Sequence, residues 1–263
     1  MLRGTIAILR KELRSYFASP IAYIVAAVFW LLAGFFFIRI LDAVVANSLQ
    51  ADALAEQFGQ SQSFDAGTLL LQQFLSLLGT LSLFILPMLT MGLYTEERRR
   101  GTMELLATSP LSNVAVALGK WLAALVFFVT LLLPLLACQV LAFSSTNPGM
   151  NYAHVAIAHF GLILLAASVM ALGMFISSLT DNTLIAAIST FGLLLLLWVI
   201  DSAAGDGTGA IAAGLRHLSL LQHFETWIQG TVSSSSFVLF ASLCGLGIFL
   251  TVQSVEAMRW QSR

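Results

Sequence analysis

Long apolar segments constrain this chain more than any other feature. Each of them can cross the roughly 30 Å of a bilayer's hydrocarbon at about 1.5 Å per helical residue. The six segments run over residues 21–41, 69–93, 114–143, 154–179, 183–200 and 237–255. Segments of this length favour helices, which satisfy all backbone polar groups internally. We therefore expect an all-α integral membrane protein that forms one transmembrane domain over residues 1–263.

Composition supports the membrane class. Apolar residues make up 59% of the chain and charged residues 10%, whereas a soluble domain carries about 25% charged residues. The net charge of −1 gives no sign of a nucleic-acid partner. Cys138 and Cys244 both fall inside apolar segments, so we interpret them as packing residues and not as a disulfide or metal pair.

The cations predict the topology. If the N-terminus is cytoplasmic, ten of the 12 Lys and Arg residues lie on the inner side and only Arg39 and Arg216 on the outer side. The inner cations are Arg3, Arg10, Lys11, Arg14, Arg98, Arg99, Arg100, Lys120, Arg259 and Arg263. The positive-inside rule then predicts six spans in the bacterial inner membrane, with both termini cytoplasmic. The first apolar segment is longer than a signal-peptide core, so we expect the N-terminus to be retained.

Residues 1–19 have the pattern of an amphipathic helix that lies in the membrane interface as an N-terminal elbow. Apolar residues recur at helical spacing, and cations are available to meet lipid headgroups. The apolar positions are Leu2, Ile6, Leu9, Leu13 and Phe17, and the basic ones are Arg3, Arg10, Lys11 and Arg14. The alternative interpretation is an ordinary basic flank of the first span.

Residues 94–112, YTEERRRGTMELLATSPLS, form a strongly charged stretch between the second and third spans. Gly101 interrupts the charged run, and Thr102 can cap a short helix with Glu104 near its positive end. Pro110 stops that helix from continuing. A short cytoplasmic helix joined to two spans can transmit force from a soluble partner. The alternative is an anchor loop that only fixes topology.

Residues 201–236 are predicted to lie on the outer side. Apolar residues recur at helical spacing in this segment, but it is too polar to span. These residues are Ile211, Leu215, Leu218, Leu221, Phe224 and Ile228. We expect an interfacial or re-entrant segment with Phe224 and Trp227 at headgroup depth. An exposed loop is the alternative.

The chain lacks the motifs of several chemistries. Its Gly-Lys pair in ALGKW, residues 117–121, has neither the upstream glycine nor the following Ser or Thr of a phosphate-binding loop. The pairs His154 with His159 and His217 with His223 do not share a helix face, so we expect no metal site. No ionisable residue lies near mid-span, which argues against proton coupling and intramembrane hydrolysis. We expect no catalytic residue, and any ATP must bind another chain.

The run EERRRGTMELLATSPLS resembles the E-x-x-x-G-T-x-E-x-L-x-x-(S/T)-P-L-(S/T) segment of ABC-2 type ABC transporter permeases. The matching positions are Glu97, Gly101, Thr102, Glu104, Leu106, Ser109, Pro110, Leu111 and Ser112. Residues 11–24 and 218–230 are further similar to the gliding-motility-associated branch of that family, the latter at Leu218, Ser219, His223, Phe224 and Gly230.

The resemblance implies a type V exporter-like half-transporter with an elbow helix, six spans and a cytoplasmic coupling helix. The coupling helix would sit in a groove on a separate ABC ATPase dimer that binds ATP and Mg²⁺. Its contact residues would be Glu97, Gly101, Thr102, Glu104, Leu105, Leu106, Thr108 and Ser109, with Asp181 in the second inner turn. Short outer helices over residues 210–230 would gate the exit through Leu218, His223, Phe224 and Trp227.

Two functions remain open at this point. The first is the membrane subunit of an ABC-2 exporter that pairs with a second permease subunit, identical or related. The second is a non-transporting membrane anchor or mechanotransmitter that relays an ATPase cycle to an outer-side accessory protein. Apolar spans suit a lipid-linked, polymeric or amphiphilic cargo, and they suit a protein that only moves force equally well.

Overall fold

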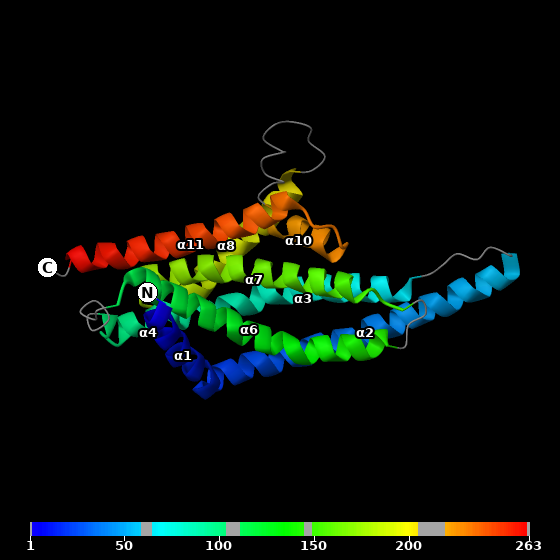
Figure 1. Cartoon of the computed structure of the whole chain (residues 1–263), viewed down its shortest axis with the longest axis horizontal. Helices are drawn as coiled ribbons and strands as arrows, with labels where there is room; N and C mark the ends of the chain where they lie inside the picture. Colours follow the sequence, from blue (N-terminus) through cyan, green and yellow to red (C-terminus); the bar gives the residue numbers. More distant parts are fainter. Residues whose placement is uncertain (1, 59–64, 104–110, 145–148, 205–218, 262–263) are drawn as a thin grey trace.

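The computed structural model describes residues 2–58, 65–103, 111–144, 149–204 and 219–261, and within these ranges every regular element is an α-helix. The helices lie largely along one long axis (Figure 1), and both termini lie at the same end of it. Their bounds are α1 Leu2–Ala18, α2 Pro20–Phe58, α3 Ala66–Thr90, α4 Gly92–Arg99, α6 Asn113–Phe143, α7 Tyr152–Leu179, α8 Thr183–Ala204, α10 Leu220–Ile228 and α11 Ser234–Gln261.

Five helical stretches within the described ranges are long and apolar enough to cross a membrane. They are Pro20–Leu54, Ala66–Arg99, Asn113–Phe143, Tyr152–Leu179 and Ser234–Met258. The corresponding stretch of α8, Thr183–Val199, is a shorter apolar helix. The prediction of an all-helical, multi-pass membrane protein is therefore confirmed. The sixth span stays a prediction that rests on α8.

Helix α2 is much longer than the predicted first span, which ended at Leu41. It has 39 residues, or about 58 Å at 1.5 Å per residue, roughly twice the thickness of the hydrocarbon core. The extension is rich in Ala, Leu and Gln, which are good helix formers, so the helix continues where the hydrophobicity falls. Its far end projects beyond α3 (Figure 1) and carries the exposed acids Asp42, Asp52 and Glu56.

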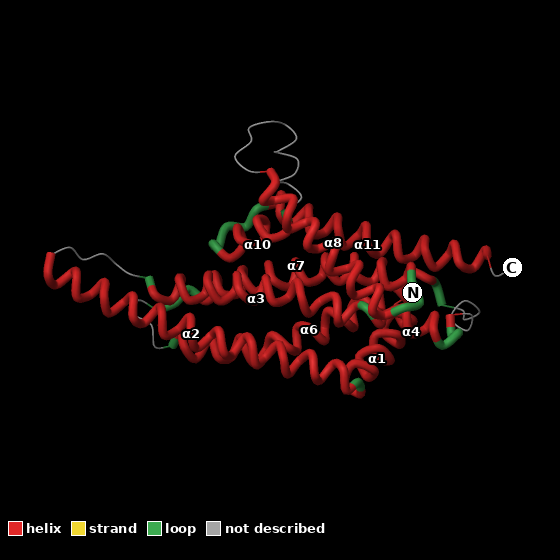
Figure 2. Tube along the Cα trace, turned by 180° about the vertical axis from the view of Figure 1, so that it is seen from behind, coloured by secondary structure: helices red, strands yellow, loops and turns green. Residues whose placement is uncertain are grey.

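Helix α7 is the centre of the bundle. It packs against α3, α4, α6, α8, α10 and α11, and most of its residues are buried. Viewed from behind, the long helices surround it and α1 crosses the end that holds the N-terminus (Figure 2). Gly247 of α11 approaches so closely that an added Cβ would lie 2.6 Å from the carbonyl carbon of Ala171. Small residues thus allow α7 and α11 to meet backbone to backbone.

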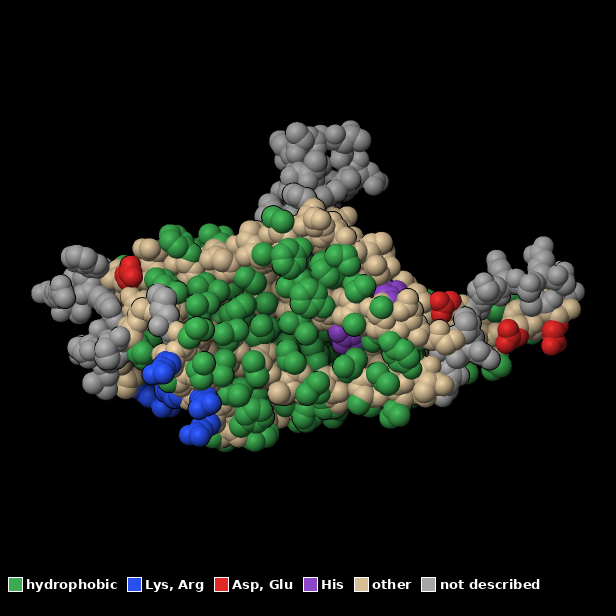
Figure 3. All heavy atoms as spheres, in the orientation of Figure 1, with side chains coloured by type: hydrophobic (Ala, Val, Ile, Leu, Met, Phe, Trp, Pro, Cys, Tyr) green, Lys and Arg blue, Asp and Glu red, His purple; other side chains and the backbone are tan. Residues whose placement is uncertain are grey.

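The charges are distributed unevenly along the long axis. On the face shown in Figure 3, Lys and Arg side chains gather at the end that holds α1, and the middle of the bundle is apolar. Most acidic side chains on this face lie toward the opposite end, where α2 projects. The distribution agrees with the positive-inside argument, and the cytoplasmic side is expected at the basic end.

Candidate functional site

Helix α4 continues α3 after a short interruption at Met91. The Met91 carbonyl accepts hydrogen bonds from the hydroxyls of Ser177 (2.9 Å) and Thr95 (2.6 Å). The Ser177 hydroxyl in turn accepts the backbone N–H of Tyr94 at 3.0 Å. Pro87, one turn earlier, lacks an N–H and cannot donate to the Leu83 carbonyl, whereas the Met91 N–H still donates to the Pro87 carbonyl at 2.9 Å. The interruption is therefore satisfied by a side chain of α7, which ties α4 to the central helix.

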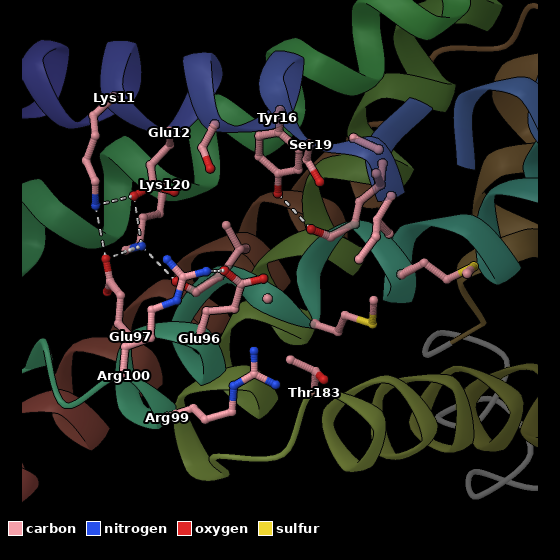
Figure 4. Close-up of a pocket in the computed structure, with 18 of the residues that line it drawn as sticks. Lys11, Glu12, Tyr16, Ser19, Glu96, Glu97, Arg99, Arg100, Lys120 and Thr183 are labelled. Atoms are coloured by element: carbon pink, nitrogen blue, oxygen red, sulfur yellow. Dashed lines mark hydrogen bonds and ion pairs between the residues drawn. The ribbon is translucent and has the colours of Figure 1, made fainter. Parts of the chain in front are cut away.

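A cluster of four charges joins α1, α4 and α6, and we call it the inner charge cluster. Lys120 of α6 has only 2% of its side chain exposed. Its Nζ lies 3.0 Å from Oε1 of Glu12 on α1 and 3.0 Å from Oε1 of Glu97 on α4. Lys11 closes the cluster, with its Nζ 3.1 Å from Glu12 and 3.2 Å from Glu97 (Figure 4).

Further groups compensate for the burial of this lysine. The Lys120 ammonium donates to the Leu93 carbonyl at 2.7 Å and lies 5.1 Å from the centroid of the Tyr94 ring. Nearby, the Tyr16 hydroxyl donates to the Leu89 carbonyl at 2.7 Å. A buried charge is costly unless several partners replace its water, and here two carboxylates, a carbonyl and an aromatic face do so. The cluster therefore fixes α1 and α4 to the start of α6.

Titration of the α1 residues reflects this environment. Burial alone would raise the pKa of Glu12, but the ammonium groups of Lys120 and Lys11 outweigh burial and hold that pKa below its ordinary value of 4.5. Burial alone would lower the pKa of Lys11, but the carboxylates of Glu12 and Glu97 raise it above 10.5. Burial also raises the pKa of Tyr16, helped by Glu12 and Glu96. At neutral pH the α1 members of the cluster are charged and Tyr16 is neutral.

Helix α4 ends in a glycine turn that separates two predicted contact residues. Gly101 has φ +67°, the Gly101 N–H donates to the Arg98 carbonyl, and the Thr102 N–H donates to the Glu97 carbonyl. This is a Schellman turn, in which an L side chain at the glycine position would be strained. The predicted interruption at Gly101 is therefore confirmed, with Glu97 on α4 and Thr102 beyond its end, and most of the helix that Thr102 was expected to cap lies outside the described residues.

The predicted partner contacts divide into three groups. Glu97 points inward to the inner charge cluster, and Gly101 is exposed at the turn while Thr102 is half-buried. Asp181 is exposed in the turn between α7 and α8. The remaining positions lie outside the described residues: Glu104, Leu105, Leu106, Thr108 and Ser109.

Arg98 links the two inner turns. Its Nη1 donates to the Ser178 carbonyl at the end of α7, 2.7 Å away. The following turn begins α8, whose first N–H groups at Leu184 and Ile185 are capped by the Asn182 side chain, at 2.9 and 3.3 Å. Asp181 therefore lies in a well-ordered turn beside α4. The Arg98 bond thus joins the end of α4 to the end of α7, just before the turn that contains Asp181.

Helix α1, the predicted elbow, lies against protein on one face. Its Ile8 is buried and meets Gly119, where an added Cβ would lie 2.7 Å from the Cβ of Ile8. Leu2, Ile6 and Phe17 of the predicted apolar stripe are exposed. Part of the stripe expected to face lipid thus stays exposed, whereas Leu13 packs against the core and the Phe17 ring packs edge-on against Phe127 of α6. The face that contains Glu12 and Ile8 also packs on α6.

Helix α10, which contains His223, Phe224 and Trp227 of the predicted outer gate, is held in place by its aromatic side chains. Phe224 is 1% exposed and Trp227 is 3% exposed. The Phe224 ring packs on Gly79 of α3, and Trp227 packs on Gly161 of α7. These side chains lie inside the protein, not on its lipid-facing surface, because the two glycines leave room for the rings. His223 contacts the Ser236 hydroxyl at 2.8 Å, and Leu218 lies outside the described residues.

Helix α10 ends in the same kind of turn as α4. Gly230 has φ +78°, its N–H donates to the Trp227 carbonyl, and the Thr231 N–H donates to the Thr226 carbonyl. His154 of α7 adds a clamp, since its Nε2 donates to the Ile228 carbonyl at 2.7 Å. The outer candidate gate is consequently a short helix docked on α3 and α7.

Sequence reasoning missed the residues that position α4. It treated Lys11 as a topology signal and a headgroup contact, dismissed Lys120 as part of a phosphate-binding loop, and did not single out Glu12 or Ser177. One usable signal was Glu12, the only acidic residue in a basic N-terminal segment. Its partner could not be identified from spacing, because Glu12 and Lys120 are separated by 108 positions.

Among the residues that the structure describes, no three His, Cys, Asp or Glu side chains are grouped so that they could hold a metal ion. A search of curated proteins found no match. A comparison with protein families found one described as ABC-2 family transporter protein, matched over residues 6–255. That match covers nearly the whole chain, and the chain therefore belongs to the ABC-2 transporter family of membrane proteins.

Proposed function

We propose that this chain is the permease subunit of an ATP-driven ABC-2 exporter. Family membership supports the permease role. The observation that carries the coupling proposal is the attachment of α4, which forms the first part of the proposed coupling segment, residues 94–112. Lys120, Ser177 and the Ser178 carbonyl fasten α4 to α6 and α7. A push on the segment after Gly101 would therefore move several helices together.

In this proposal a separate ABC ATPase dimer binds ATP and Mg²⁺ and docks on the surface around residues 101–112 and Asp181. Closure of the dimer would displace α4 and, through the inner charge cluster, α1 and α6. A second permease subunit, identical or related, would complete the path across the inner membrane. Helix α10 would open or close its outer exit. Both termini would be cytoplasmic, at the basic end of the molecule.

Asp181 offers a cleaner test of this coupling than Glu97, whose reversal would also disrupt the inner charge cluster. The tagged chain is purified from its native membranes in mild detergent, and vanadate-sensitive ATP hydrolysis of the complex is measured. Asp181→Lys is expected to reduce co-purifying hydrolysis about tenfold, because the reversed charge opposes the partner's surface. Asp181 is exposed in a surface turn, so the variant should fold normally.

Asp52→Lys is the matched control. It makes the same charge change on the exposed far end of α2 and is expected to leave hydrolysis unchanged. Absence of hydrolysis from the wild-type preparation, or equal loss in both variants, would contradict the coupling proposal.

The extension of α2 favours a second candidate function, in which the ATPase cycle is relayed to an outer-side protein without transport. The helix is long enough to reach well beyond the membrane. Proteoliposomes containing the chain and its ATPase distinguish the two. ATP-dependent movement of an amphiphile across the bilayer supports the exporter. Hydrolysis without any movement supports the relay.

A further inference from the structure

A cavity of about 630 Å³ lies beside the inner charge cluster, between α1, the start of α2 and the junction of α3 and α4 (Figure 4). Its size is within the range of small-molecule sites. One end is charged, and the other end is apolar. The charged lining residues are Lys11, Glu12, Glu96, Glu97, Arg99, Arg100 and Lys120. Neither the family assignment nor the coupling mechanism accounts for this cavity.

The charges of the lining do not balance. Four cations and three carboxylates line the cavity, which leaves one excess positive charge. Lys11 and Lys120 pair with Glu12 and Glu97, and Arg100 pairs with Glu96 at 3.3 Å. Arg99 is exposed, and among the described residues no carboxylate lies within ion-pair distance of it. The cavity therefore offers one guanidinium to an anion.

The other end of the cavity suits a hydrocarbon chain. It is lined by Ile21, Ala22 and Val25 of α2 and by Met88 and Leu89 of α3. Ile21 is 54% exposed and Met88 is 46% exposed, so the apolar end opens to the surface of the bundle. Exposed apolar side chains continue along α2 at Ile24 and Leu31, among others. A chain longer than the cavity could follow that surface within the membrane.

Hydroxyl groups separate the two ends. Ser15, Tyr16 and Ser19 line the α1 side between the charged and apolar residues. The same helix carries exposed apolar residues suited to a membrane interface. The order charge, hydroxyl, hydrocarbon matches the order of groups in a membrane amphiphile at that depth.

We propose that this cavity binds an amphiphile with a single negative charge, its anionic head at Arg99 and its apolar chain along Ile21 and Met88. The site belongs to one subunit and requires neither the ATPase nor the second permease subunit. It goes beyond the proposed transport function and stands if that function fails. A membrane phospholipid and a free anion share the head chemistry, and only the phospholipid supplies the chain.

The test uses the purified full-length chain in a nonionic detergent. Its thermal unfolding midpoint is followed during titration with dioctanoyl phosphatidylglycerol, which has one negative charge. A ligand that binds only the folded state raises the midpoint with concentration, and the dependence gives Kd. Parallel titrations use dioctanoyl phosphatidylcholine, which has no net charge, and inorganic phosphate, which has no chain. We expect saturable stabilisation by phosphatidylglycerol alone.

Arg99→Gln is expected to weaken the phosphatidylglycerol Kd about tenfold, the effect of losing one charge-assisted hydrogen bond. Arg14→Gln is the matched control, since Arg14 is exposed on α1 and does not line the cavity. It should leave Kd unchanged. Equal weakening by both variants would mean general attraction to basic protein and would overturn the proposal. Equal stabilisation by phosphatidylcholine or by phosphate would overturn it as well.

Discussion

Helices α4 and α10 are the two short helices of the bundle as far as the structure describes it, with eight and nine residues. Both end at a glycine with positive φ, and both contact α3, α7 and α8. They differ in what holds them. Ion pairs to Lys120 and hydrogen bonds to α7 hold α4. No described ion pair holds α10, which is docked by Phe224 and Trp227 on glycines of α3 and α7 and by one hydrogen bond from His154.

The difference shows two solutions to one problem. A helix of eight or nine residues is not stable alone, so its conformation depends on tertiary contacts. The stability of an attachment made by ion pairs changes when a charge is removed or the pH shifts. Its ion pairs and hydrogen bonds are also directional, so they can transmit a displacement of the helix. An attachment by close packing is sensitive to volume and indifferent to charge. The inner helix therefore suits a coupling element, and the outer helix suits a fitted lid.

The largest expected effect comes from Lys120→Met, which leaves two partly buried carboxylates facing only Lys11. Breaking such a buried pair by removing one partner costs about 3 to 5 kcal/mol. Lys11→Met is the control, because Lys11 is 59% exposed and an exposed pair contributes about 1 kcal/mol or less. Denaturant unfolding in detergent measures both. A loss for Lys120→Met no larger than for Lys11→Met would contradict the importance of the buried charge.

A smaller effect is expected from Gly161→Leu on the packing side of the comparison. Even a Cβ at this position would lie 2.6 Å from Trp227, and overpacking costs about 1 to 3 kcal/mol. Gly192→Leu is the matched control on α8, where an added Cβ meets nothing within 4 Å. Unfolding and the fluorescence of Trp227 report the change. An unperturbed Trp227 environment in Gly161→Leu would refute the docking described for α10.

The smallest effect concerns acid pH. The folded-state pKa of Glu12 lies below the ordinary value of 4.5, so the unfolded state binds the proton more readily. Glu12 thus contributes stability above pH 4.5, and this contribution is lost as pH falls through the folded-state pKa. Wild type should lose more stability than Glu12→Gln over that interval. If the free energy of unfolding had the same pH dependence in both proteins, the lysines of the cluster would not hold the Glu12 carboxylate.

Much of the fold could be predicted because hydrophobicity is a local property. The predicted segment 114–143 agrees with Asn113–Phe143, and 154–179 agrees with Tyr152–Leu179. The first apolar segment was predicted to end at Leu41 and to be followed by a connection of a helix plus a loop, and the structure joins that connecting helix to the span as one helix, α2, through Phe58. The predicted interruption at Gly101 agrees with the structure, because α4 ends at Arg99 and Gly101 has a positive φ.

The candidate site was harder to predict because its contacts are distant in sequence. A charged run around Glu97 looked like a solvent-facing surface, yet its position in the fold turns Glu97 toward Lys120. Likewise Phe224 and Trp227 looked like interfacial aromatics, and only the placement of Gly79 and Gly161 reveals their burial. The sequence pattern identifies candidate residues such as Glu97 and Trp227, but only the tertiary structure shows which residues they contact.

Hydrogen–deuterium exchange of the backbone amides in α4 and α10 tests the central claim most directly, namely that charge holds α4 and packing holds α10. The proteins compared are wild type, Lys120→Met and Gly161→Leu. Exchange is expected to accelerate at least about tenfold in α4 alone for Lys120→Met, and in α10 alone for Gly161→Leu, because each loses its own attachment. Unchanged exchange in α4 of Lys120→Met, or equal acceleration of both helices in both variants, would contradict the claim.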